Sequence, residues 1–227
     1  GVHWPEGPHL YKKGEYYYIL HAEGGTGPEH AVSVCRSRNV FGPYENNFCN
    51  PVFTNRNLGS AYPIQYVGHA DLVETSRGDW YMVMLAVRPL KGYTTLGRET
   101  FLARVIWEKD WPVVNPGVGM LTDTVEINLP EWKPETVINQ KEKYYDFTKQ
   151  RSLGAEFLTI RNPQEGSYTL TEKGLQISFG KYTLKEKESP SYLALRQENH
   201  FFEAAAVLST ANLSERKKAG IALVQSN

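Results

Sequence analysis

The first half of the chain consists of short runs in which apolar and polar residues alternate, each ending at a glycine or a cluster of polar residues. Such alternation is typical of half-buried β-strands. Residues 9–20 read as two strands around a tight turn at Gly14, and residues 70–84 repeat this arrangement around Gly78. The pattern therefore predicts two hairpins that occupy equivalent places in a repeat.

A second pair of strand-like runs follows each hairpin. Residues 31–36 lead to 41–44 after the first hairpin, and residues 100–107 lead to 110–113 after the second. Two copies of a four-stranded unit are the sequence pattern of β-propeller blades. Propellers close with about four to eight blades. Two blades therefore imply either assembly with further copies of the chain or a longer polypeptide, and we favour the longer polypeptide.

The pattern changes towards residue 140, where the segment 128–134 has the proline-rich polarity of a connector. Beyond it, short strands spaced as in a β-sandwich are expected at residues 168–170, 175–179, 192–196, 202–208 and 220–224. The expected fold class is all-β, with propeller blades over residues 1–140 and the first part of a β-sandwich over residues 141–227.

Composition excludes two classes of partner. Of the 227 residues, 41% are apolar, which is enough for a packed core. The 25 Lys and Arg residues balance 25 Asp and Glu residues, so no nucleic-acid partner is expected. No apolar run approaches the length of a membrane-spanning helix, so no membrane partner is expected. Composition decides neither the oligomeric state nor whether the protein is cytoplasmic or exported.

The segment 4–9, with the sequence WPEGPH, is the first candidate for chemistry. Its two prolines and one glycine restrict the backbone around Glu6, and Trp4 and His9 can shield the carboxyl group from water. A shielded glutamic acid that keeps its proton near neutral pH is what a general acid requires. The alternative is that Glu6 is a solvated loop residue.

Two further candidates precede predicted inner strands, which line the central channel of a propeller. His69 there holds a cation or a water cluster, or is a hydrogen-bonded structural imidazole. Arg98 makes bidentate hydrogen bonds to a carboxylate or to sugar hydroxyl groups, or else pairs with the adjacent Glu99. The glycine-rich loop 24–27, which ends near His30, is interpreted as a hairpin connection.

These motifs, in this order, resemble glycoside hydrolase family 43, in particular its β-xylosidase and α-arabinofuranosidase members. The matching stretches read EGPHLY at 6–11, AEGGT at 22–26, His30 with Arg36-Ser37, GPY at 42–44, GHA at 68–70 and GRET at 97–100. The stretches RNP at 161–163 and PSYLALRQ at 190–197 are similar to the C-terminal β-sandwich of the β-xylosidase branch. The resemblance covers nearly the whole chain.

The resemblance implies a five-bladed propeller, of which this chain holds later blades, and hydrolysis of xylan-derived oligosaccharides or polysaccharides with inversion. It implies that Glu6 is the general acid and that Arg98 contacts substrate and orients the catalytic base. His69 matches a central histidine that lies over a calcium ion or a water cluster, and no cofactor is required. Trp4 and Tyr93 are expected to help form an aromatic wall against the sugar.

One departure from the family pattern concerns the catalytic base. Inversion needs a second carboxylate, and in the family that aspartate precedes the EGPH motif, so it has no matching position here. Asp71, Glu23 and Glu99 are carboxylates within motifs of other roles, and none is assigned as the base. We therefore expect this chain alone to be inactive.

Two non-catalytic alternatives remain at this stage. One is a carbohydrate-binding propeller and sandwich protein, and the other is a β-rich structural module whose Tyr and Trp residues serve only packing. The catalytic interpretation requires Glu6, His69 and Arg98 to converge in the fold.

Overall fold

The structure is a computed structural model that describes residues 3–127, 142–209, 213–214 and 217–225. The chain divides into two compact units, Gly1–Trp132 and Lys133–Asn227, which are treated separately here. The expected boundary near residue 140 lies outside the described residues, so it stays a prediction. Within the described ranges, no helix is long and apolar enough to cross a membrane.

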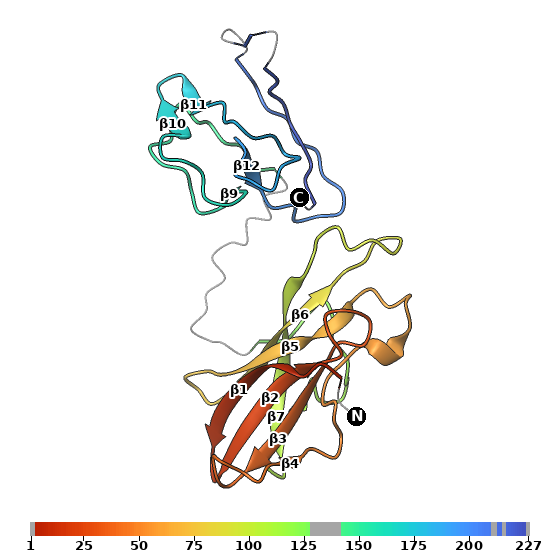
Figure 1. The fold of residues 1–227 in the computed structure, drawn as a ribbon. Helices are drawn as coiled ribbons and strands as arrows, with labels where there is room; N and C mark the ends of the chain where they lie inside the picture. Colours follow the sequence, from red (N-terminus) through yellow and green to blue (C-terminus); the bar gives the residue numbers. More distant parts are fainter. Residues whose placement is uncertain (1–2, 128–141, 210–212, 215–216, 226–227) are drawn as a thin grey trace. The chain divides into compact units, whose positions relative to one another are not determined.

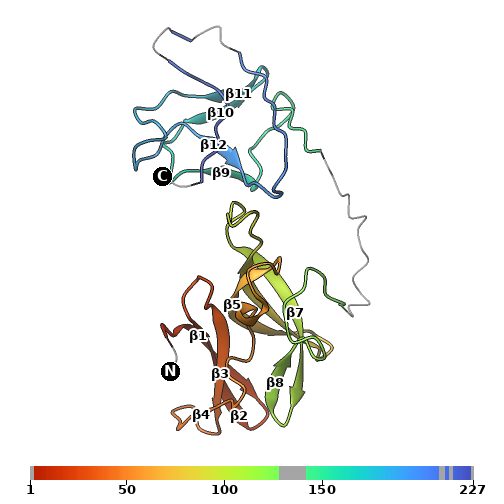
Figure 2. The same cartoon turned by 90° about the vertical axis from the view of Figure 1, so that its right-hand side faces the viewer.

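The first unit contains two four-stranded antiparallel sheets, each with its strands in sequence order (Figures 1 and 2). The first sheet comprises β1 (Glu6–Lys13), β2 (Tyr16–Glu23), β3 (Ala31–Ser37) and β4 (Glu45–Asn46). The second comprises β5 (Gln65–Glu74), β6 (Trp80–Val87), β7 (Glu99–Glu108) and β8 (Trp111–Val114). A single 3-10 turn, η1 (Arg56–Leu58), lies in the described connection between the sheets. The predicted four-stranded repeat is confirmed.

The period-two pattern of the strands explains where the core lies. In β2, every second residue from Tyr18 is buried, and in β6 the same holds from Met82. These faces join in one hydrophobic cluster shared by both sheets. At one side of the cluster, the ring of Trp107 contacts Tyr18 and Trp80, with centroid distances of 5.0 and 5.3 Å. The core therefore fixes how the two blades sit against each other.

Extra residues interrupt the two innermost strands, β1 and β5. In β1, Glu6 pairs with Ala22 but His9 pairs with Leu20, so one residue is added opposite β2. In β5, similar register shifts occur on both sides of Gly68. Such β-bulges bend a strand and redirect its side chains. The bulges set the directions of the residues that form the site.

The second unit contains two two-stranded sheets, β10 (Tyr168–Thr171) with β11 (Gly174–Ile177), and β9 (Phe157–Thr159) with β12 (Leu193–Leu195). Three of the expected strands are thus present, β10 one residue longer than expected and β11 and β12 shorter. No strand forms at the expected positions 202–208 and 220–224, where apolar residues such as Val207 and Leu223 are exposed. β9 was not expected.

Candidate active site

Glu6 is the first residue of β1, and its side chain is 48% exposed. The next residue, Gly7, has a φ of +55°, a left-handed conformation that glycine adopts at little cost. This conformation belongs to the bulge between Glu6 and His9. The sequence thus holds Glu6 at a bend of the innermost strand, with access to solvent.

His69 faces Glu6 from the neighbouring blade. Its Nδ1 lies 3.8 Å from Oε1 of Glu6, and its own φ of +50° belongs to a bulge in β5. Gly7 makes room for the imidazole, because a Cβ at that position would lie 2.5 Å from Nε2 of His69. Gly7 therefore serves two needs, the backbone conformation and the close approach of His69.

His30 completes the group, and it is only 1% exposed. Its Nδ1 lies 2.9 Å from the backbone carbonyl oxygen of Tyr66. Because a carbonyl only accepts hydrogen bonds, Nδ1 carries the proton and Nε2 has a free lone pair. Nε2 is buried and has no hydrogen-bond partner among the described residues. One ligand atom from each of Glu6, His30 and His69 lies within 4.8 Å of the others.

Burial lowers the pKa of His30 and so favours its neutral form. The Tyr66 carbonyl and the Glu6 carboxylate oppose this shift of the pKa, and His69 and Arg98 lower the pKa further. Gly68 allows the ring this position, since a Cβ there would lie 2.5 Å from Nε2 of His30. Sequence reasoning treated His30 only as the end of a loop. The GHA motif contained the signal, because its glycine is the residue that admits the ring.

Arg98 belongs to the same electrostatic environment. Its charge acts on His30, and its side chain is exposed. The neighbouring Glu99 does not compete for it, because Arg88 forms a two-fold ion pair with Glu99 at 2.9 and 2.6 Å. Glu6 and His69 meet at 3.8 Å, as the catalytic interpretation requires, whereas the convergence of Arg98 with them stays a prediction.

The two predicted aromatic wall residues lie in different settings. Trp4 is 70% exposed, and the segment before it is held where the Gly24 amide donates to the His3 carbonyl oxygen at 2.7 Å. Tyr93 is 71% exposed at the end of a tight turn closed by two backbone hydrogen bonds with Leu90. No hydrogen bond or ring contact in the described part of the chain joins either residue to Glu6.

The three unassigned carboxylates are engaged elsewhere. Asp71 accepts a hydrogen bond from the Tyr11 hydroxyl at 2.9 Å and pairs with Nδ1 of His9 at 2.7 Å. Glu23 is buried and accepts from the Ser33 hydroxyl at 2.9 Å. Glu99 is held by Arg88 as described. Asp71, Glu23 and Glu99 thus each have a polar partner, and none is assigned as the base.

A calcium ion is one of the two expectations at His69, the other being a water cluster, and the donors around His69 do not fit calcium. Calcium takes about six to eight oxygen ligands. Glu6, His30 and His69 offer one carboxylate and two imidazole nitrogens. Calcium is therefore given no role in the reaction, and the water cluster at His69 stays a prediction.

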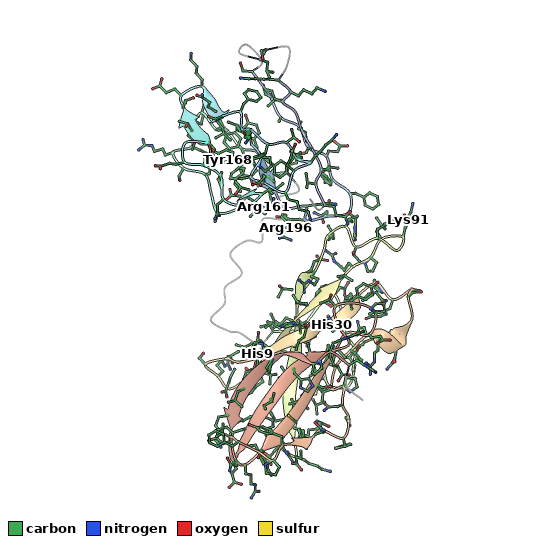
Figure 3. The ribbon with its side chains drawn as sticks, viewed as in Figure 1. His9, His30, Lys91, Arg161, Tyr168 and Arg196 are labelled. Atoms are coloured by element: carbon green, nitrogen blue, oxygen red, sulfur yellow. The ribbon has the colours of Figure 1, made fainter. Side chains whose placement is uncertain are left out.

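Figure 3 labels His30, which directly precedes β3, and His9, which lies on β1.

Two family models match the chain. The model of glycosyl hydrolases family 43 matches residues 1–112, and that of the beta xylosidase C-terminal concanavalin A-like domain matches residues 144–227. The chain belongs to glycoside hydrolase family 43. Family 43 membership accounts for the order of motifs from Glu6 to Arg98, and the second match agrees with a sandwich-type second unit.

Known relatives extend this result. The chain is 50% identical to a xylosidase/arabinosidase of Butyrivibrio fibrisolvens over 228 residues, covering 100% of this chain and 44% of the relative. It is 41% identical to a non-reducing end alpha-L-arabinofuranosidase of Bacteroides ovatus, covering 96% of this chain and 41% of the relative. The chain thus spans less than half the length of these two relatives.

Solved structures of family 43 share the fold. The crystal structure of a xylan beta-1,4-xylosidase from Bacillus Halodurans C-125 matches with a TM-score of 0.75 and 38% identity, covering 86% of this chain and 37% of that chain. The structure of a family 43 protein from Bacteroides ovatus matches with a TM-score of 0.75 and 42% identity, covering 87% of this chain and 39% of that chain. The predicted all-β class, with propeller blades followed by a sandwich-type domain, is confirmed.

Proposed function

We propose that the protein containing this chain is a glycosidase that hydrolyses O-glycosidic bonds of xylo-oligosaccharides or arabinose side chains with inversion, and that Glu6 is its general acid. The observation that carries the proposal is the meeting of Glu6 and His69 at 3.8 Å on the innermost strands of adjacent blades. The charge of Arg98 lowers the pKa of the neighbouring His30. The relatives are a xylosidase/arabinosidase and an arabinofuranosidase, which supports the substrate class.

In the proposed reaction, protonated Glu6 donates its proton to the glycosidic oxygen as the bond to the anomeric carbon breaks. A water molecule attacks that carbon from the opposite face and gives its proton to a second carboxylate, about 6.5–9.5 Å from the acid in inverting enzymes. Glu6 ends the cycle ionised and regains a proton from solvent. The steps are acid–base chemistry and need no organic cofactor.

The other residues of the site have supporting roles in this proposal. Arg98 contacts the substrate and orients the base, because its guanidinium is exposed and not paired with Glu99. Trp4 and Tyr93 offer exposed rings for stacking against a sugar. The second carboxylate is not assigned to any residue of this chain, since Asp71 is held by Tyr11 and His9.

A graft tests the proposal. The segment of the Butyrivibrio fibrisolvens relative that matches this chain is replaced by this chain, and nitrophenol release is measured from nitrophenyl β-D-xyloside and nitrophenyl α-L-arabinofuranoside. We expect activity on at least one substrate. NMR of the first product formed reports inversion, since a β-xyloside then gives α-xylose first.

The acid role is tested with Glu6→Gln in the same graft. General-acid catalysis contributes about 10²–10⁴-fold, so kcat/KM for a methyl glycoside should fall by that factor. A dinitrophenyl glycoside, whose leaving group needs little protonation, should be affected much less. The matched control is Glu15→Gln, which alters an exposed carboxylate paired with Arg38 at 3.3 Å just beyond the other end of β1.

Two outcomes would contradict the proposal. Equal activity of Glu6→Gln and Glu15→Gln on the methyl glycoside would remove Glu6 from the acid role. Xylobiose binding by an inactive parent graft would favour the carbohydrate-binding alternative, which the names of the relatives do not support. The isolated chain should release no nitrophenol, and release that Glu6→Gln abolishes would show that the chain contains its own base.

A further inference from the structure

The loop 24–29 joins β2 to β3 and is bound to the chain just before β1. The amide of Gly24 donates a hydrogen bond to the His3 carbonyl oxygen at 2.7 Å. A Cβ at Gly25 would lie 3.7 Å from Cε3 of Trp4, so the indole ring rests on this glycine. The candidate general acid follows Trp4 by two residues, which span at most about 7 Å. The loop therefore restricts where the acid can lie.

The two ends of this loop are in direct contact. Gly24 has a φ of +79°, and a Cβ at this position would overlap the carbonyl oxygen of Glu29. The amide of His30 donates to the Gly27 carbonyl oxygen at 3.1 Å. Because His30 follows the closed end directly, the loop positions both the chain before the acid and the buried histidine beside it.

Arg56, the first residue of η1, contacts both ends of the loop. Its Nη1 donates to the Glu29 carbonyl oxygen at 3.4 Å and lies 3.6 Å from Oε1 of Glu23, the last residue of β2. Glu23 is buried, and its other carboxylate oxygen accepts from the Ser33 hydroxyl at 2.9 Å. A buried carboxylate is costly unless it is paired and hydrogen-bonded. Arg56 thus stabilises a buried charge at one end of the loop and binds the backbone at the other end.

The same segment also binds the backbone of His30. The Arg56 amide donates to the Thr54 hydroxyl oxygen at 3.1 Å, and this hydroxyl donates to the His30 carbonyl oxygen at 2.8 Å. The segment 54–56 therefore binds the carbonyl oxygens of two consecutive residues, Glu29 and His30. Such contacts fix the path of the chain rather than the conformation of one side chain.

We propose that Arg56 is a positioning residue for the general acid. By joining Glu23 to the Glu29 carbonyl, it keeps the loop 24–29 closed. The closed loop then holds the chain before Glu6 in place. This inference rests on the proposed function, because it concerns the residue that donates the proton. It also gives the buried Glu23 a role other than that of the catalytic base.

The kinetic test compares Arg56→Gln with the parent in the active graft. A misplacement of about 1 Å can cost about 100-fold in rate, so kcat/KM for the methyl glycoside should fall by about 10–100-fold. The dinitrophenyl glycoside needs little protonation and should be affected much less. A variant that only lowered the amount of folded protein would reduce both activities by the same factor. The matched control is Arg77→Gln, an exposed arginine in the turn between β5 and β6, which should change neither activity.

Two further variants test the contacts themselves. Both side-chain contacts of Arg56 come from the single atom Nη1, and a lysine ammonium is a compact charge with three donors. Arg56→Lys should therefore retain most of the activity on the methyl glycoside. Glu23→Gln removes the charge that Arg56 meets. Its effect combined with Arg56→Gln should be smaller than the sum of the two single effects, because the residues are in contact.

Hydrogen exchange of the isolated chain measures loop closure without any catalysis. The Gly24 amide is bound to the His3 carbonyl oxygen, so it should be protected in the parent chain. Arg56→Gln should lose this protection, whereas Arg56→Lys and Arg77→Gln should keep it. Circular dichroism checks that each variant is folded. If Arg56→Gln is unfolded, the same two measurements on Glu23→Gln decide.

The outcomes separate the two proposals. Equal losses on the two glycosides, or unchanged exchange of the Gly24 amide, would overturn the positioning role of Arg56. An inactive parent graft, or one whose activity on the methyl glycoside survives Glu6→Gln, would overturn the proposed function instead. In that case the exchange of the Gly24 amide would still show whether Arg56 holds the loop closed.

Discussion

Gly68→Ala perturbs the site directly without removing any of its functional side chains. An added Cβ would lie 2.5 Å from Nε2 and 2.6 Å from Cγ of His30, closer than real Cβ atoms come to other heavy atoms. The ring cannot simply retreat, because it is 1% exposed and its Nδ1 is bound to the Tyr66 carbonyl. Either the backbone of β5 shifts or the imidazole leaves its place.

The expected cost follows from these two routes. Inserting a methyl group into a well-packed interior costs about 1–3 kcal/mol through displaced side chains and backbone. Loss of the hydrogen bond to Tyr66, if the ring moves, adds about 0.5–1.5 kcal/mol. We therefore expect Gly68→Ala to lower the free energy of unfolding of the first unit by roughly 1–4 kcal/mol.

Tryptophan fluorescence in urea measures this unit selectively. All 5 tryptophans of the chain lie within residues 1–132, which is the first unit. The matched control is Gly27→Ala, whose added Cβ meets nothing within 4 Å and whose backbone is not left-handed. That control should be neutral, or stabilising by up to about 1 kcal/mol through the unfolded state. The urea midpoints of the two variants should therefore move in different directions or by clearly different amounts.

A double-mutant cycle identifies the ring as the cause. With His30→Ala the imidazole is gone, so adding Gly68→Ala should cost little more than Gly27→Ala does. Residues in contact show coupling energies of about 0.5–3 kcal/mol in such cycles. An equal effect of Gly68→Ala in both backgrounds would refute the packing of His30 against Gly68, and with it the position of its free nitrogen.

Two other variants test how the blades are joined. Arg36→Lys should lower the free energy of unfolding of the first unit by about 1.5–3 kcal/mol, because the 13%-exposed guanidinium stacks on Trp111 at 4.0 Å and makes charged hydrogen bonds that an ammonium cannot reproduce. Arg38→Lys, at a 70%-exposed side chain, should change the free energy of unfolding in urea by less than about 0.5 kcal/mol. Burial raises the pKa of Tyr11 to about 12, so the stability that the neutral hydroxyl contributes is complete below pH 10 and is lost as the pH rises towards 12. In Tyr11→Phe the Leu72 amide also loses its hydrogen-bond partner. Between pH 8 and 11, the urea midpoint of this variant should therefore start below that of the parent and fall less steeply.

The parts of the fold that sequence predicted are those with local causes. The hairpin at residues 9–20 forms as expected, with Lys13 paired to Tyr16 around the turn, because alternation and a turn glycine act over a few residues. The fourth strand of the first sheet begins later than expected, at Glu45, and has two residues. In the second unit, β9 and β12 pair across more than 30 positions, and such pairing has no local signal.

The same division holds for the candidate site. Glu6, His69 and Arg98 were found because each lies in a motif that can be read in a single stretch of sequence. The role of His30 was missed, because it depends on a carbonyl 36 positions later in the chain and on a glycine after that. When the hydrogen-bond partner of a polar side chain is a backbone atom far along the chain, the sequence around that side chain gives little indication of its role.

The bulges explain why two strands of ordinary alternation meet at one point. In an unbroken strand, side chains two residues apart share a face and the next residue faces away. One added residue reverses this order, and it does so at Gly7 in β1 and at His69 in β5, both with positive φ. A non-glycine residue in this conformation costs about 1–3 kcal/mol. The preceding residue, Gly68, leaves room for the ring of His30, because an added Cβ there would lie 2.5 Å from Nε2, so two adjacent residues of β5 serve the two histidines of the site.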